Sequence, residues 1–150
     1  MTTALTLAKP DHLDVLCTLC TAFHAEAQIS MDHQTRRGAL QALLEGMPYG
    51  VAYLMGPLRA PVGYLVLTFS WSIEFGGLDG MIDELYVRPA VRGRGIAREA
   101  LIALPRALTR GGLRAVHLEV RRDNAAAIRL YQRAGFAPRE NYILMSKQLS

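Results

Sequence analysis

The sequence predicts an α/β fold, with a mixed, mostly antiparallel sheet of six or seven strands and helices on both faces. Three apolar segments are joined by short turns, so they must lie antiparallel to one another. Two further strands are separated by a helical segment, residues 96–108, and a crossover of that length makes them parallel neighbours. The 150 residues fit one domain, residues 1–150, and the 51% of hydrophobic residues is enough for its core.

The N-terminal part of the chain predicts one strand followed by two helices. Residues 4–8 form a short first strand, and Pro10 then opens a helix that runs to about residue 27 on an apolar face. Asp32 suits the N-cap of a second helix, because its short polar side chain can accept from a free backbone N–H. We expect Gly46 to end that helix.

The middle of the chain predicts a meander of three strands. Residues 49–55, 62–73 and 81–87 are apolar segments of strand length that contain β-branched and aromatic residues. The connections at residues 56–61 and 74–80 hold glycine or proline, which are typical of turns. These three strands therefore form the antiparallel part of the sheet.

The C-terminal part predicts two helices and two strands. Helix 96–108 contains Pro105, which removes a hydrogen bond, so we expect a kink or an early end there. Residues 115–120 form the strand parallel to 81–87, residues 125–134 form a helix, and residues 141–148 form a last strand. This last strand completes the expected count of six or seven.

The composition predicts a cytoplasmic protein. No apolar run approaches the roughly 20 residues of a membrane span, and the first ten residues lack the basic start and apolar block of a secretory signal. Cys17 and Cys20 form a C-x-x-C pattern, but they lie in an apolar helical run without a second pair of ligands. We therefore expect buried, reduced thiols and no metal site.

The charge is distributed unevenly along the chain. Residues 1–87 carry four basic and nine acidic side chains, whereas residues 88–150 carry thirteen basic and four acidic ones. A basic half suits a polyphosphate ligand, and an acidic half suits a cationic one. We do not expect nucleic-acid binding, because the arginines are not interleaved with aromatic residues and no recognition motif is present.

A glycine-rich loop between a strand and a helix is the strongest functional signal. Its residues are Arg92, Gly93, Arg94, Gly95, Ile96 and Ala97. A loop of this kind presents unpaired N–H groups at the positive end of a helix dipole, and the arginines add full charge. The segment therefore predicts a phosphate-binding loop, although a tight turn without a ligand would have the same pattern.

A second motif makes the first more specific. The segment LEVRRDNAAAIRLYQRAGF, residues 118–136, resembles the second half of the acyl-CoA-binding core of the GNAT superfamily of N-acetyltransferases. The loop Arg92-x-x-Gly95-x-Ala97 is similar to that superfamily's pyrophosphate signature, Gln/Arg-x-x-Gly-x-Gly/Ala. The resemblance covers about residues 82–136. It implies acetyl-CoA as cosubstrate, bound with its pantetheine arm between two splayed strands, here residues 81–87 and 115–120.

Acetyl transfer from a thioester to an amine needs a base, and Glu84 is the first candidate. It lies in the middle of strand 81–87, beside the implied cofactor cleft, and a carboxylate can take the ammonium proton directly or through water. Strict alternation along the strand would place Asp83 on the opposite face. Asp83 remains a competitor, and Glu84 could instead be a structural acid beside Arg88 or Arg92.

The resemblance implies the other site residues. Tyr131 matches a tyrosine that stands near the thioester sulfur and acts as general acid, although it could simply pack on Phe136. Asn124 matches a cofactor-contacting asparagine and also suits a helix N-cap. The cofactor would further contact the backbone of Leu85, Tyr86 and Val87, where we expect a strand bulge to free an N–H as oxyanion donor.

These residues predict an N-acetyltransferase that moves an acetyl group from acetyl-CoA to a primary amine of a small molecule or protein. The alternative is a non-catalytic, CoA-binding regulatory module on the same fold. His24, Glu26 and His33 lie at the helix pair that shapes the acceptor site in the resembled family, but they also suit exposed helix ends. We expect a cationic amine, because acids occur near the expected acceptor side at Glu26, Asp32, Glu74 and Asp79.

Homodimer formation is the remaining expectation. Residues 141–148 are an apolar strand near the end of the chain, and an edge near residues 64–69 is a second possible contact. The resembled family often dimerises, which favours the same assembly here. The acceptor amine itself cannot be read from these residues, because charge alone does not separate a polyamine, an aminoglycoside and a lysine side chain.

Overall fold

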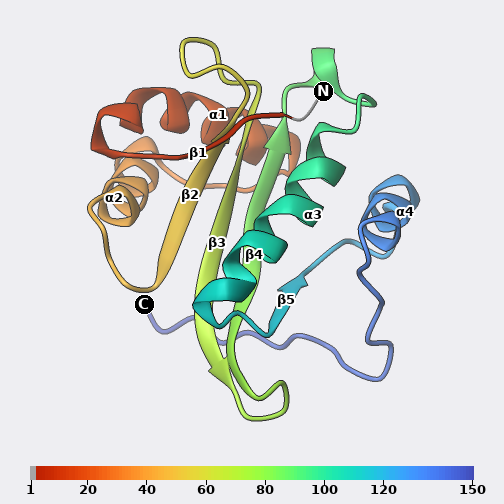
Figure 1. Cartoon of the computed structure of the whole chain (residues 1–150). Coiled ribbons are helices and arrows are strands. Elements are labelled where there is room, and N and C mark those ends of the chain that lie inside the picture. The colour runs from red at the N-terminus through yellow and green to blue at the C-terminus, as the bar shows by residue number, and fades with distance from the viewer. Residues whose placement is uncertain (1–2) are drawn as a thin grey trace.

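The computed structural model describes residues 3–150, which form one mixed sheet of five strands (Figure 1). The strands follow chain order across the sheet: β1 (Leu5–Leu7), β2 (Gly50–Met55), β3 (Gly63–Ser72), β4 (Gly77–Val87) and β5 (Ala115–Leu118). The first four are antiparallel neighbours, and β5 runs parallel to β4. The mostly antiparallel mixed sheet is thus confirmed, and the expected count of six or seven strands is wrong.

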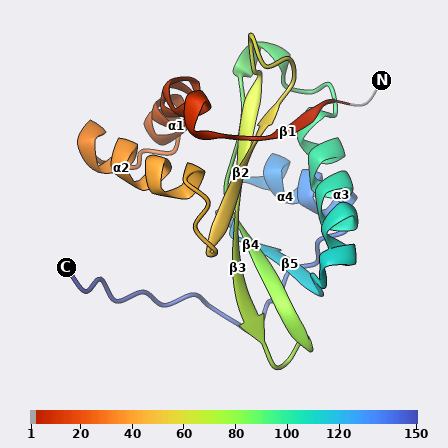
Figure 2. The same ribbon diagram turned by 60° about the vertical axis from the view of Figure 1, so that its left-hand side comes forward.

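The missing strand is the one expected at residues 141–148. Within residues 3–150 this segment pairs with no other strand, and it crosses to the far side of the sheet to end away from the domain (Figure 2). Its apolar side chains are largely exposed, from 64% for Tyr142 to 84% for Met145. The apolar pattern that predicted a strand is present, but a strand also needs a neighbour for its backbone hydrogen bonds.

Two helices cover each face of the sheet, as expected (Figure 2). Helices α1 (Leu13–Glu26) and α2 (His33–Leu44) lie on one side, and α3 (Ile96–Leu108) and α4 (Ala125–Arg133) lie on the other. A short 3-10 turn at Pro10–His12 leads into α1, and Asp32 caps α2 by accepting from the Thr35 N–H at 2.8 Å. Among the described residues, no helix has the length and apolarity needed to span a membrane.

Helix α3 continues through Pro105 to Leu108, so the expected early end is wrong. Proline removes one hydrogen bond, the one that would reach the Leu101 carbonyl. Leu101 and Leu104 are almost fully buried against the sheet, at 2% and 4% exposure. Their packing keeps this turn of the helix in place despite the missing bond.

The core consists of two apolar clusters, one on each face of the sheet, and β3 contributes to both. Tyr64 and Val66 pack under α1 and α2, whereas Leu65 and Leu67 pack under α3. β3 is therefore a central strand buried on both faces, paired with β2 and β4. This position excludes the sheet edge that we expected near residues 64–69.

A β-bulge at Asp83 changes which side chains of β4 face which helices. Val66 on β3 pairs with Glu84 and Leu67 pairs with Ile82, so Asp83 is an extra residue without a partner. Before the bulge Ile82 faces the α3 cluster, and after it Tyr86 faces the α1 cluster. Simple alternation would put these two residues on one face, so the alternation that we expected to separate Asp83 from Glu84 does not hold here.

The parallel strands β4 and β5 separate beyond the bulge. They pair only from Asp79 to Ile82 on β4, and β5 ends at Leu118. Beyond that point β4 keeps β3 as its neighbour, and the Arg88 N–H donates to the Val62 carbonyl at 2.8 Å. Because N–H directions alternate along a strand, those of Leu85 and Val87 face the gap left by β5. The expected splayed pair is therefore present.

Candidate active site

The gap between β4 and the chain after β5 forms a cleft of about 200 Å³. Its walls come from four parts of the chain: α1 through Phe23, the end of β4, the segment that follows β5, and α4. The residues that line it include three carboxylates, an amide and a phenol: Asp83, Glu84, Glu119, Asn124 and Tyr131. The structure thus brings together at one cleft the two catalytic candidates from the sequence and Asn124.

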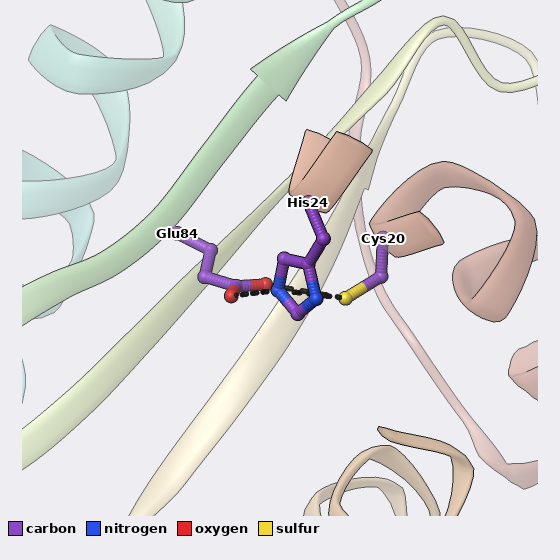
Figure 3. Close-up of side chains that lie close together, drawn as sticks. All are labelled: Cys20, His24 and Glu84. Atoms are coloured by element: carbon purple, nitrogen blue, oxygen red, sulfur yellow. Dashed lines mark hydrogen bonds and ion pairs between the residues drawn. The ribbon is translucent and has the colours of Figure 1, made fainter. Parts of the chain in front are cut away.

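Glu84 points from β4 toward Cys20 and His24 of α1 (Figure 3). Together with Tyr64 from β3, these residues surround its carboxylate with three donors. The Tyr64 hydroxyl donates to Oε1 at 2.7 Å, and the Cys20 thiol donates to the same oxygen at 3.4 Å. The His24 Nε2 lies 2.6 Å from Oε2. The Glu84 side chain remains 17% exposed, so the carboxylate is held by the protein on one side and open on the other.

The two donors to Oε1 keep their protons at every working pH. Burial, opposed in part by a hydrogen bond with Tyr64, raises the pKa of the Cys20 thiol to about 12. Burial also raises the pKa of Tyr64 far above its ordinary value, and the nearby Glu84 charge adds to the shift. Cys20 is therefore a buried structural thiol, as the sequence predicts, and not a nucleophile.

Cys20, His24 and Glu84 have the residue types and proximity of a metal site, because one ligand atom from each lies within 4.8 Å of the others. The protonation of His24 argues against that reading. Arg36 donates to His24 Nδ1, so the proton of the neutral ring sits on Nε2, which faces the other two residues. A metal-binding nitrogen must be free of its proton, so we assign no ion to this cluster.

The other two cleft carboxylates are more exposed than Glu84. Asp83 lines the cleft next to Glu84, and loss of solvent around its carboxylate, followed by the Glu84 charge, raises its pKa. Glu119 comes from the opposite wall, in the segment directly after β5. Asp83 therefore stays a competitor for the role of base, and Glu119 joins it.

Tyr131 and Asn124 lie at the two ends of the α4 segment that borders the cleft. The Tyr131 ring packs edge-on against Phe136 with centroids 6.4 Å apart, and burial raises the pKa of its phenol. Its hydroxyl has no hydrogen-bond partner in residues 3–150, so it is available to a ligand. The Asn124 Oδ1 accepts from the Ala127 N–H at 3.1 Å, which leaves its NH₂ group to face the cleft.

The predicted phosphate loop has the backbone geometry that an anion needs. Gly93 and Gly95 have positive φ angles of 79° and 81°, and the space beside both Cα atoms is open. No backbone N–H from Gly93 to Ala97 has an acceptor within the described part of the chain. The first hydrogen bond of this helix turn runs from the Glu99 N–H to the Gly95 carbonyl. Free N–H groups at the start of a helix are the feature that an anion-binding loop needs, so the phosphate-binding role of this loop stays a prediction.

Arg92 binds protein rather than standing free at this loop. Its Nε donates to the Val87 carbonyl at 2.8 Å, its guanidinium lies over the Tyr86 ring, and a terminal nitrogen contacts Glu26 at 2.6 Å. Arg92 therefore fixes the loop to the end of β4 and to the last turn of α1. The exposed Arg94 carries the charge that can turn toward a phosphate.

The four acids expected near an acceptor do not gather at the cleft. Glu26 pairs with Arg92, Asp32 caps α2, and Glu74 pairs with Arg139. Asp79 is buried and accepts from Ser70 at 2.6 Å. The negative charge of the cleft comes instead from Asp83, Glu84 and Glu119.

Sequence reasoning missed the residues that surround Glu84. Tyr64 reads as one of several apolar strand positions, and Cys20 reads as core. His24 was placed either at an exposed helix end or in a pocket; it is 4% exposed and contacts Glu84. A useful signal was present, since His24 lies four residues after Cys20 and so shares its apolar helix face.

Comparison with known proteins identifies the family. The profile of the acetyltransferase (GNAT) family matches residues 17–136 of this chain. The chain belongs to the GNAT family of acetyltransferases. The matched region begins in α1 and includes the cleft, the anion loop and Tyr131, and GNAT acetyltransferases use acetyl-CoA.

Two sequence relatives are acetyltransferases by name. Acetyltransferase SG1711 from Sodalis glossinidius is 35% identical over 77 residues, which are 49% of this chain and 54% of the relative. Mycothiol acetyltransferase from Nocardia farcinica is 37% identical over 76 residues, which are 49% of this chain and 25% of the relative. The alignments therefore span about half of the first relative and a quarter of the second.

Solved structures share the whole GNAT fold. An integron cassette protein from a salt-marsh metagenome, HFX_CASS3, is 32% identical with a TM-score of 0.84, covering 97% of this chain and 90% of its own. The aminoglycoside N-acetyltransferase AAC(6')-Iy, solved with CoA, is 16% identical with a TM-score of 0.81, covering 98% and 95%. At that identity the second likeness concerns the fold alone.

Proposed function

We propose that this GNAT protein transfers an acetyl group from acetyl-CoA to a primary amine that enters the cleft between β4 and β5. The observation that carries the proposal is the alignment of three features along one path. The free N–H groups of residues 93–97 can hold a pyrophosphate, and the Leu85 and Val87 N–H groups face the gap. The cleft with its carboxylates and the Tyr131 hydroxyl lies next along β4.

We assign the chemical roles by position. Glu84 accepts the proton of the attacking amine at the open side of its carboxylate. The backbone N–H of Leu85 or Val87 donates to the carbonyl oxygen as negative charge develops there. Tyr131, which burial keeps protonated, donates to the leaving thiolate. Acetyl-CoA supplies the activated acyl group.

The acceptor is proposed to be a cationic amine. Three carboxylates and one arginine, Arg121, line a cleft of about 200 Å³, and this excess of negative charge favours a positively charged ligand. Polyamines, aminoglycosides and lysine side chains all have this chemistry. A panel of such amines, with acetyl-CoA and a thiol-detecting reagent, tests the proposal. Thiol release with cationic amines and none with neutral amines of the same size is the expected result.

The choice of base is tested by the pH dependence of kcat/KM. Glu84→Gln should remove the acidic limb of the profile, because an amide cannot take the ammonium proton. Asp83→Asn and Glu119→Gln are the matched controls, since each neutralises one other carboxylate of the same cleft. If either control erases the limb and Glu84→Gln keeps it, the base is that residue.

A CoA-binding protein without catalysis is the alternative function, and the same panel addresses it. Acetyl-CoA that binds tightly while every amine in the panel fails to release thiol would favour the regulatory reading. Binding is measured by calorimetry on the unmodified chain. Failure of both binding and turnover would remove the acetyl-CoA proposal altogether.

We further propose that the protein forms a homodimer by exchange of residues 141–148. The outer edge of β5 pairs with no strand of residues 3–150, and beside it lies a groove of about 1270 Å³. Apolar side chains line that groove, among them Val116, Leu118 and Phe136. Residues 142–144 of the same chain lie at its border, although they form no strand there. The exposed apolar tail of a second copy fits this open edge, because added strands pair through backbone groups and alternate side chains. A monomeric mass by light scattering at micromolar concentration would count against it.

A further inference from the structure

The imidazole of His24 lies between two charged side chains on the α1 side of Glu84. The Arg36 Nε donates to His24 Nδ1 at 3.1 Å, and His24 Nε2 lies 2.6 Å from Glu84 Oε2 (Figure 3). Arg36 comes from α2, His24 from α1 and Glu84 from β4, so this chain of contacts connects three elements. Both Arg36 and His24 are buried, at 6% and 4% exposure.

Arginine fixes the position of the proton on this imidazole. A guanidinium group has only donors, so His24 Nδ1 must accept the hydrogen bond from Arg36. The one proton of a neutral imidazole is then on Nε2, where it points at Glu84. A second proton would have to enter at Nδ1, which the Arg36 N–H already occupies.

We propose that His24 is a positioning residue that holds the Glu84 carboxylate toward the cleft, and that Arg36 fixes His24 in the form that can do so. This inference rests on the proposed role of Glu84 as base. The hydrogen bonds through the imidazole run in the opposite direction to those of a Ser-His-Asp triad. In that triad a carboxylate accepts from Nδ1–H, which leaves Nε2 free to act as base. Here the guanidinium donates at Nδ1, so His24 can only donate at Nε2.

The charges support this arrangement. Besides His24, the polar partners of the Arg36 guanidinium are His33 Nδ1 at 3.0 Å, the Met31 carbonyl at 3.2 Å and the Thr21 hydroxyl at 3.5 Å, and none of them is a carboxylate. Within residues 3–150, no carboxylate lies within 4.0 Å of Arg36. A buried cation needs a counter-charge, and two carboxylates supply it: Glu84 across the His24 ring, and Asp32 at the start of α2. The pKa of Asp32 is lowered by hydrogen bonds from Thr35 and, in part, by the Arg36 charge.

The other groups that face Glu84 leave one position for the substrate proton. Tyr64 from β3 and Cys20 from α1 donate to Oε1 and occupy both of its acceptor sites. His24 fills one of the two acceptor sites of Oε2, and the second stays open. Asp83 lies beside Glu84 on β4, and the opposite wall of the cleft presents further titratable side chains, namely Glu119, Arg121 and Tyr131. Among these groups, His24 alone orients Oε2.

Nitrogen NMR of histidine-labelled protein tests the tautomer without reference to activity. We expect His24 to show the Nε2–H form, because the Arg36 N–H occupies Nδ1. In Arg36→Met, Nδ1 loses its donor, so we expect signals of a second form of the ring. An Nδ1–H tautomer in the unmodified protein would overturn the proposal.

Two substitutions of His24 separate positioning from folding. Gln places an N–H where Nε2 stands and can still donate to Glu84, whereas Asn keeps an acceptor for Arg36 but is too short to reach Glu84. We expect His24→Asn to lower kcat about 10- to 100-fold, with KM for acetyl-CoA unchanged, because the base is misplaced. Its acidic limb should move to higher pH, because the carboxylate loses a donor that favours its charged form.

His24→Gln should restore most of the activity that His24→Asn loses. If His24→Asn keeps the pH profile of the unmodified protein while Glu84→Gln abolishes the acidic limb, the positioning role of His24 is wrong. The assignment of Glu84 as base is then unaffected. If Glu84→Gln keeps the limb, the assignment of the base is wrong, and the NMR result still decides the tautomer of His24. Melting temperatures of both variants show whether either has simply unfolded.

Discussion

The two cysteines of α1 differ in their access to solvent. Cys20 is 2% exposed with a pKa raised to about 12, so only ~10⁻⁴ of it is thiolate at pH 8. Cys17 is half-buried. Iodoacetamide at that pH should modify Cys17 and leave Cys20 intact, as peptide mass spectrometry of the treated protein would show. Equal modification of both would mean that α1 opens readily.

Tyr131 should act through its hydroxyl alone. Tyr131→Phe removes the proposed acid and keeps the ring on Phe136, so kcat should fall about 10²–10⁴-fold with little change in CoA affinity. Because burial raises the pKa of Tyr131, the unmodified enzyme should show no basic limb from this group below about pH 10. Tyr49→Phe, at a 70% exposed position, is the matched control. Equal kcat in the two variants would remove Tyr131 from the mechanism.

Single residues were predictable where a local rule decides their position. Asn124 and Asp32 cap helices because short polar side chains satisfy free N–H groups. The surroundings of Glu84 were not predictable, because Cys20, His24 and Tyr64 meet it only after distant segments pack together. We expected a bulge at residues 85–87, whereas the structure has it at Asp83, where no glycine marks the position.

At the scale of the element, the loop before α3 can be tested by adding a side chain. Gly95→Glu should weaken acetyl-CoA binding strongly, because it places bulk and negative charge where the free N–H groups point. The positive φ angle of 81° also strains any side chain there. Gly46→Glu is the matched control, with a φ angle of 88° and open space around it.

Calorimetry distinguishes the two effects of this substitution. Both variants carry the same backbone strain, so both should lose some thermal stability. Only Gly95→Glu should lose acetyl-CoA affinity. Unchanged affinity in Gly95→Glu would mean that the cofactor pyrophosphate binds elsewhere.

Helices and strands were predicted well where the apolar pattern extends over many residues. The order of strands and helices up to residue 134 follows from spacing and turn residues, and the parallel pair follows from the length of the α3 crossover. The last strand was wrong because a strand depends on a neighbour that the local sequence does not contain. The passage of α3 through Pro105 depends on tertiary packing in the same way.

At the scale of the whole molecule, the C-terminal tail should control assembly. Leu144→Asp places a charge in the exposed apolar run, so the proposed strand exchange should weaken and the mass in solution should halve. Leu58→Asp is the control, because Leu58 is 48% exposed in the turn between β2 and β3. A dimeric Leu144→Asp variant, measured by sedimentation, would place the contact elsewhere.

The bulge at Asp83 adds one residue to β4 without changing how the residues on either side of it pair with β3. Removing Asp83 would leave Val66 opposite Glu84 and Leu67 opposite Ile82, so the strand would become regular without turning. Glu84 would keep its donors on α1, and the N–H groups of Leu85 and Val87 would still face the gap. Relatives that carry this chemistry on a regular strand should therefore be one residue shorter at this position.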